Sequence, residues 1–186
     1  MTAPLLTRSA FKTSRLLDFC SERELVKQIG HDVHDWPLVI IKELLDNAID
    51  AAEEARVAPV IMIELDRAQA AGDAIIVADN GPGISPETVT NILDFATRTS
   101  SREAYVSPTR GAQGNALKTI LAMGYALSGE VGQIVIESQG VAHRITFRAD
   151  PVRQEPRIER APEPSEVKIG TRVTVYWPVC ALLTAL

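Results

Sequence analysis

The sequence predicts an α+β fold, a sandwich of two layers in which helices cover one face of a mixed β-sheet. The first observation is helical periodicity in two long segments of the N-terminal third, residues 15–30 and 35–56. The second is a direct succession of alternating segments towards the C-terminus, at 133–137, 142–148 and 171–177. Strands that follow one another without helices between them argue against a strictly alternating parallel fold.

Local signals set the first two helices. Apolar residues at helical spacing predict a helix over 15–30, and Gly30 is its expected stop. Asp35 can cap the helix at 35–56, and Pro37 is tolerated in the first turn of that helix.

Short strands and helices follow in the middle of the chain. Residues 60–65 alternate in polarity and 73–78 form a β-branched apolar run, so both are predicted strands. Ser85 is the expected cap of a short helix at 86–95, and a further helix is predicted at 115–127.

Two segments are predicted to lie outside regular structure. Residues 100–114 have no periodicity and are rich in Ser, Thr, Gly and Arg, which indicates a long loop. Residues 150–165 contain four prolines, which lack backbone donors, so this segment is expected to be a surface loop or an edge connection.

Composition excludes several classes of protein. The 186 residues are 46% hydrophobic and 23% charged, which is typical of one globular domain. Nineteen basic and 24 acidic residues give a net charge of −5, so direct nucleic-acid binding by this domain is not expected. No apolar run approaches the roughly 20 residues of a membrane span, and residues 1–10 make a poor signal peptide. A cytoplasmic protein is therefore predicted, with Cys20 and Cys180 as free thiols.

The helix at 35–56 carries polar groups on one face. Glu43, Asn47 and Asp50 are spaced at steps of four and three, opposite a predicted apolar stripe. The expected stripe consists of Leu38, Ile41, Leu45, Ala48, Ile49 and Ala52. The polar face is either a solvated surface or a metal and water site. In the second case the Asn47 oxygen suits Mg²⁺, and Glu43 can take a proton from a water molecule.

The sequence Asp79-Asn80-Gly81-Pro82-Gly83 directly follows the apolar strand at 73–78. An ionised Asp79 accepts hydrogen bonds, so its natural partner is an amino group such as the exocyclic amine of adenine. An ordinary type I or II turn is the alternative, because such turns are rich in these residue types.

Glycines precede the helix at 115–127, in the segment 109–118. Glycines ahead of a helix N-terminus let backbone N–H groups converge on an anion, and Lys118 adds a cation. The glycine spacing is not that of a Walker A loop, and no strand directly precedes it as in a dinucleotide fingerprint. The loop by itself leaves phosphate binding open.

The order of these motifs carries more information than any one of them. Glu43-x-x-Asp46-Asn47-x-x-Asp50-Ala51, Asp79-x-Gly81-x-Gly83, Gly111-x-x-Gly114 and Gly170-Thr171 together resemble the GHKL ATPase superfamily. The resemblance covers residues 35–178. The segment 109–118 looks most like the ATP-binding B subunit of type IIB DNA topoisomerases, the topoisomerase VI type.

The resemblance implies a Bergerat-type fold and a set of roles. Glu43 would be the general base for water attack on the γ-phosphate, and Asn47 would ligate Mg²⁺. Asp79 would accept from the adenine amine, with Thr171 joining through a shared water. The implied ATP-binding residues are Asn47, Asp50, Asp79, Gly81, Gly83, Ile84, Gly111, Gln113, Gly114, Asn115, Ala116, Leu117, Lys118 and Thr171.

The resemblance also implies an organisation of the chain. Residues 1–34 would form an N-terminal arm and helix that can dimerise, and 35–178 the ATP-binding domain, with a lid at about 84–114. Residues 179–186 would be a tail or the start of a further region. ATP would close the lid and drive homodimerisation, next to a DNA-cleaving partner subunit.

Two departures from the family pattern bear on activity. Ala116 stands where topoisomerase-type members have a third glycine, although alanine still offers its N–H. Topoisomerase-type members continue into a transducer domain that supplies a lysine to the γ-phosphate. The chain, which stops near Leu186, is therefore expected to be a fragment or to work without that lysine. Slow hydrolysis by this chain alone is therefore expected. The alternatives are a nucleotide-sensing interaction domain without hydrolysis and a GHKL protein kinase.

Other polar residues are given structural interpretations. No metal is expected at His31 and His34, which lie in a polar turn, and His143 is expected to be a surface or pairing residue of a strand. The lid arginines are expected to be solvated, with phosphate or a partner chain as the alternative. They are Arg98, Arg102 and Arg110.

Overall fold

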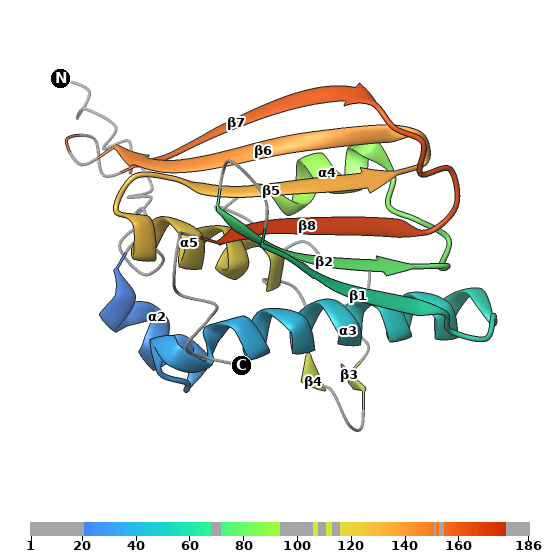
Figure 1. The fold of residues 1–186 in the computed structure, drawn as a ribbon, viewed down its shortest axis with the longest axis horizontal. Coiled ribbons are helices and arrows are strands. Elements are labelled where there is room, and N and C mark those ends of the chain that lie inside the picture. The colour runs from blue at the N-terminus through green and yellow to red at the C-terminus, as the bar shows by residue number, and fades with distance from the viewer. Residues whose placement is uncertain are drawn as a thin grey trace, which may run out of the picture.

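The computed structural model describes residues 21–67, 72–93, 106–107, 111–112, 116–150, 152 and 155–177. These residues form a sheet of six strands with helices packed against it. Figure 1 shows α3 (Trp36–Ala55) and α5 (Ala116–Ser128) lying along one side of the sheet. The predicted α+β sandwich of two layers is therefore confirmed.

The remaining helices are short. They are α2 (Glu22–Ile29), the 3₁₀ helix η1 (Val33–Asp35) and α4 (Pro86–Ile92). Gly30 ends α2 in the left-handed conformation, with φ of 77°, as the sequence predicts. The predicted Ser85 cap is also confirmed, because the Ser85 hydroxyl accepts from the Thr88 N–H. Asp35 occupies the N-cap of α3, but its side chain makes no capping bond.

The long sheet has the order β1-β2-β8-β5-β6-β7. Its strands are β1 (Ile61–Asp66), β2 (Asp73–Asp79), β5 (Gly132–Ser138), β6 (Val141–Asp150), β7 (Glu155–Pro164) and β8 (Thr171–Trp177). A second, two-stranded sheet pairs β3 (Val106–Ser107) with β4 (Gly111–Ala112).

The expectation of a mixed sheet is wrong in the described residues, where every pair of neighbouring strands is antiparallel. The connection from β2 to β5 passes through α4 and α5, and these two strands do run in the same direction. However, β8 lies between β2 and β5 and runs antiparallel to both. The strand β8, which is the last along the chain, therefore separates β2 and β5, which would otherwise have formed a parallel pair.

The proline-rich segment is an edge strand, β7, rather than a loop. Pro156, Pro162 and Pro164 oppose Ala149, His143 and Val141 of β6. All three prolines occupy even positions, so their nitrogens share one side of the strand. A strand at the edge of a sheet tolerates proline where the missing N–H would face away from its neighbour.

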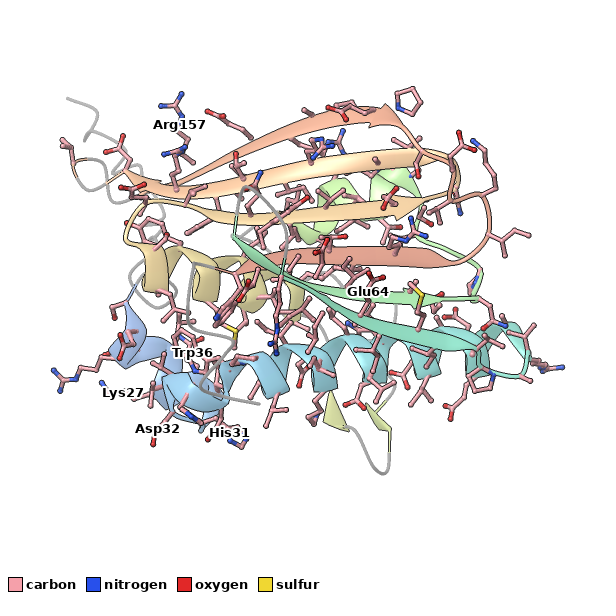
Figure 2. All side chains as sticks on the ribbon, in the orientation of Figure 1. Lys27, His31, Asp32, Trp36, Glu64 and Arg157 are labelled. Atoms are coloured by element: carbon pink, nitrogen blue, oxygen red, sulfur yellow. The ribbon has the colours of Figure 1, made fainter. Side chains whose placement is uncertain are left out.

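The core lies between the helices and the sheet, and Trp36 is fully buried in it. Figure 2 shows Trp36 between α2 and the start of α3, where its indole N–H donates to the His31 carbonyl at 3.2 Å. The predicted stripe of α3 is only partly right, since Ala48 and Ala52 are buried as expected. In the first turns, however, Ile40 and Leu44 are buried and Leu38 is 48% exposed. Apolar residues surround the first turns of α3, so periodicity alone does not fix its buried face.

His143 is also placed differently from the expectation. It is only 1% exposed, and neither ring nitrogen has a hydrogen-bond partner among the described residues. The alternation of β6 puts His143 on the side of Ile145 and Phe147, which are fully buried. Within the part of the chain that the structure describes, no helix is long and apolar enough to cross a bilayer.

Candidate functional site

Asp79 is the last residue of β2 and the centre of a hydrogen-bonded bend. Its Oδ1 accepts from the Gly81 N–H at 2.8 Å and from the Thr171 N–H at 3.2 Å. Both bonds end on one oxygen, which leaves Oδ2 as the carboxylate's remaining acceptor. Burial raises the pKa of Asp79, and the two backbone donors partly oppose that shift.

The backbone packs closely around this carboxylate. A Cβ atom at Gly81 would lie 2.9 Å from the Cβ of Ala51 on α3, so the bend contacts that helix directly. Gly170 has a φ of +74°, and a Cβ there would collide with the Asp79 carbonyl oxygen. Glycine at these two positions lets β2, α3 and the start of β8 approach one another.

Asn80 and Ser138 hold the same bend, and the sequence analysis missed both functions. Asn80 Oδ1 accepts from the Val60 N–H at 2.9 Å, and its Nδ2 donates to the Ala58 carbonyl at 3.0 Å. An Asn beside glycines in a turn is a recognisable signal for such bonds. Ser138 lies far along the chain, and no local pattern indicates its contact with this bend.

The helix α3, which carries the predicted polar residues, lies along one side of the sheet (Figure 1). Glu43 and Asn47 are half-buried, and Asp50 is 6% exposed and has a polar partner. Glu43 lies two turns before Ala51, or about 12 Å along the helix axis. The carboxylate of Glu43 is therefore well separated from the Asp79 bend, with Asn47 between them.

Lys42 pairs with two carboxylates on this face. Its Nζ lies 3.2 Å from Glu43 Oε1 and 2.8 Å from Asp46 Oδ2, and the Asp46 bond is the main reason why the pKa of Lys42 is raised. These side chains are largely or partly exposed to solvent. The single positive charge of Lys42 is therefore shared between two carboxylates, and the closer of them is Asp46.

The glycine-rich segment leads into α5. Leu117 and Lys118 in its first turn are 8% and 2% exposed, and Lys118 has a polar partner. Gly111 lies in β4, whereas Gln113, Gly114 and Asn115 lie outside the described residues. The expected lid is described only in part, because Arg98, Arg102 and Arg110 also fall outside those ranges.

The fold thus brings three predicted features to one side of the sheet. The half-buried Asp79 carboxylate ends β2 and has one oxygen left to accept. A face with carboxylates and an amide runs along α3, and the N-terminus of α5 favours anions. Both α3 and α5 pack against the sheet and against each other. The arrangement offers an acceptor for an amine at one end and groups suited to phosphate chemistry further along.

A family comparison identifies the class of protein to which this fold belongs. Residues 33–180 match the model of the histidine kinase-, DNA gyrase B- and HSP90-like ATPases. The match covers most of the chain, so the protein belongs to this family and is a GHKL-type ATP-binding domain. The resemblance drawn from the four motifs is confirmed.

The relatives found by sequence are B subunits of type 2 DNA topoisomerase 6. The protein of Natronomonas pharaonis is 33% identical over 79% of this chain and 19% of its own length. That of Halobacterium salinarum is 32% identical over 72% of this chain and 17% of the relative. The chain therefore spans about a fifth of the curated relatives that it matches.

Two solved structures were also found to be similar. The 43K ATPase domain of Thermus thermophilus gyrase B, in complex with an aminocoumarin, is 22% identical with a TM-score of 0.41, covering 88% of this chain and 39% of that one. The N-terminal domain of a DNA repair protein is 24% identical with a TM-score of 0.38, covering 74% of this chain and 34% of that one.

Proposed function

We propose that this chain binds ATP with Mg²⁺, hydrolyses it slowly, and works as an ATP-gated dimerising switch like the ATP-binding protein of topoisomerase VI. The observation that carries the proposal is the Asp79 carboxylate, whose Oδ1 is occupied by two backbone donors while Oδ2 is left to accept. An adenine amine is a donor that this acceptor would select. The 6-oxo group of guanine is an acceptor and would be repelled.

The residues along α3 fit the phosphate end of the same nucleotide. Asn47 supplies a neutral oxygen, and a hard cation such as Mg²⁺ takes one protein oxygen together with phosphates and waters. No cluster of three His, Cys, Asp or Glu ligands exists within the described ranges. Asn47 would therefore share the ion with the nucleotide, and the bound ion would neutralise phosphate charge.

Glu43 is the proposed general base. Its carboxylate would accept a proton from the water that attacks the γ-phosphate, one turn of α3 away from Asn47. Backbone N–H groups at the start of α5, together with Lys118, would hold the β- and γ-phosphates through the positive end of the helix dipole. Thr171, whose N–H already orients Asp79, would contact the adenine ring through a shared water.

Slow turnover and dimerisation follow from the resemblance to the ATP-binding protein of topoisomerase VI. The chain spans only 19% of the Natronomonas relative, and the resemblance places a γ-phosphate lysine in the part outside that match. The segment before residue 35 would act as the dimerising arm. A DNA-cleaving subunit is the proposed partner of the assembly, with no direct contact between this domain and DNA.

The test is isothermal titration of ADP and ATP with Mg²⁺ into wild type and Asp79→Asn. Asparagine keeps an oxygen for the Gly81 and Thr171 N–H groups but replaces the free acceptor with a donor. We expect loss of measurable binding in the variant with little change in its melting temperature. Equal ADP affinity in the two proteins would contradict the proposal.

A further inference from the structure

Ser138 joins two backbone segments beside Asp79, the proposed acceptor for the adenine amine. It is the last residue of β5 and is 1% exposed. Its Oγ accepts from the Ile84 N–H at 2.9 Å and donates to the Gly170 carbonyl at 2.9 Å. One acceptor and one donor bond satisfy the hydroxyl, so it is an integral part of this junction.

The two joined segments are those that orient Asp79. Gly170 directly precedes Thr171, whose N–H binds Asp79 Oδ1, and Ile84 ends the bend whose Gly81 N–H binds the same oxygen. The fit at Ser138 is close, because a Cβ at Gly83 would lie 2.5 Å from the Ser138 hydroxyl. Gly83 itself has a φ of +82°, so the bend reaches Ser138 through a conformation that glycine adopts readily.

We propose that Ser138 is a positioning residue for base recognition, and this inference rests on the proposed function. Its hydroxyl fixes the separation of the bend at 81–84 and the turn at 170–171. The Gly81 and Thr171 N–H groups then both stay hydrogen-bonded to Asp79 Oδ1, and the Asp79 carboxylate holds Oδ2 in a single orientation. Base selectivity consequently depends on a serine that need not touch the nucleotide.

Ser128, the last residue of α5, provides a matched control in the turn that leads into the opposite end of β5. Its Oγ donates to the Val131 carbonyl at 2.9 Å and accepts from the Glu130 and Val131 N–H groups at 3.0 and 2.9 Å. Ser128→Ala therefore removes a comparable set of bonds from a turn that does not contact Asp79. Any effect common to both variants reports a general loss of stability.

The experiment compares Ser138→Ala, Ser128→Ala and wild type in nucleotide titration and steady-state hydrolysis. We expect Ser138→Ala to weaken ATP and ADP binding about tenfold, to raise KM, and to leave kcat within about twofold. The ratio of ATP affinity to GTP affinity should also decrease several-fold, because a carboxylate with more than one orientation discriminates less between adenine and guanine. Ser128→Ala should leave the affinities and their ratio unchanged.

Amide hydrogen exchange of the unliganded protein supplies an independent measurement. Exchange at Gly81 and Thr171 should accelerate in Ser138→Ala and not in Ser128→Ala. Unchanged exchange at both amides, or an unchanged ATP to GTP ratio, would overturn the positioning role. Failure of wild type to bind any adenine nucleotide would instead reject the proposed function. Ser138→Cys keeps the side-chain shape and weakens both hydrogen bonds. Its nucleotide affinities and exchange rates are expected to lie between those of wild type and Ser138→Ala.

Discussion

The bend around Asp79 and the polar face of α3 both contribute to the candidate site, but different interactions hold them. At the bend, Asp79, Asn80 and Ser138 bind backbone groups from distant parts of the chain. On α3, Glu43 and Asn47 are half-buried and are spaced by one turn of a single helix. The difference indicates that the proposed adenine recognition depends on tertiary packing, whereas the spacing of the proposed general base and the proposed Mg²⁺ ligand depends on secondary structure alone.

Replacement of the proposed base gives the largest expected effect on activity. Glu43→Gln should lower kcat by about 10²–10⁴-fold, because an amide cannot accept the water proton, while ADP affinity stays within about twofold. Single-turnover hydrolysis measures this change. Glu53→Gln, on the exposed end of the same helix, is the control and should hydrolyse ATP at the wild-type rate. Loss of ADP binding in Glu43→Gln would contradict the assignment, because it would show that Glu43 is needed to bind the nucleotide itself.

A pair of glycine substitutions separates steric contact from backbone conformation. Gly170→Ala should destabilise the protein by at least about 2 kcal/mol more than Gly30→Ala, and should abolish ADP binding. Both glycines have left-handed φ angles, of +74° and +77°, but only Gly170 lies against Asp79. Urea unfolding of both variants measures the difference. Equal losses of stability would mean that the close contact at Asp79 contributes nothing.

The pH dependence of nucleotide affinity gives the smallest and most specific effect. Because burial raises the pKa of Asp79, its acceptor oxygen is protonated at a higher pH than an ordinary aspartate. ADP affinity should therefore fall on acidification before exposed carboxylates titrate, and its slope should report uptake of one proton. The stability of the unliganded protein should change in the opposite direction on acidification. Because the pKa of Asp79 is raised in the native state, that state binds the proton before the unfolded chain does, and the free energy of unfolding increases. Titration calorimetry in two buffers of different ionisation enthalpy measures the coupled proton.

Much of the fold could be predicted from local patterns. The strand Thr171–Trp177 has its predicted bounds, since its alternation is complete, and Gly30 and Ser85 act as the predicted helix signals. The predicted stripe of α3 holds at Ala48 and Ala52 and fails at Leu38, because apolar residues surround the first turns of the helix. The proline-rich β7 was missed because edge strands tolerate prolines that a central strand does not.

The sequence by itself determined most of the helices and strands, the spacing of Glu43 and Asn47, and the order of motifs that marks the family. The elements and the spacing depend on neighbours within a few residues, which the chain's own periodicity fixes, and the motif order is read directly along the chain. Only the tertiary structure decided that β8 separates β2 from β5 and that Ser138 meets Ile84 and Gly170. Contacts between residues so far apart in sequence arise from how the layers pack, and no local pattern encodes them.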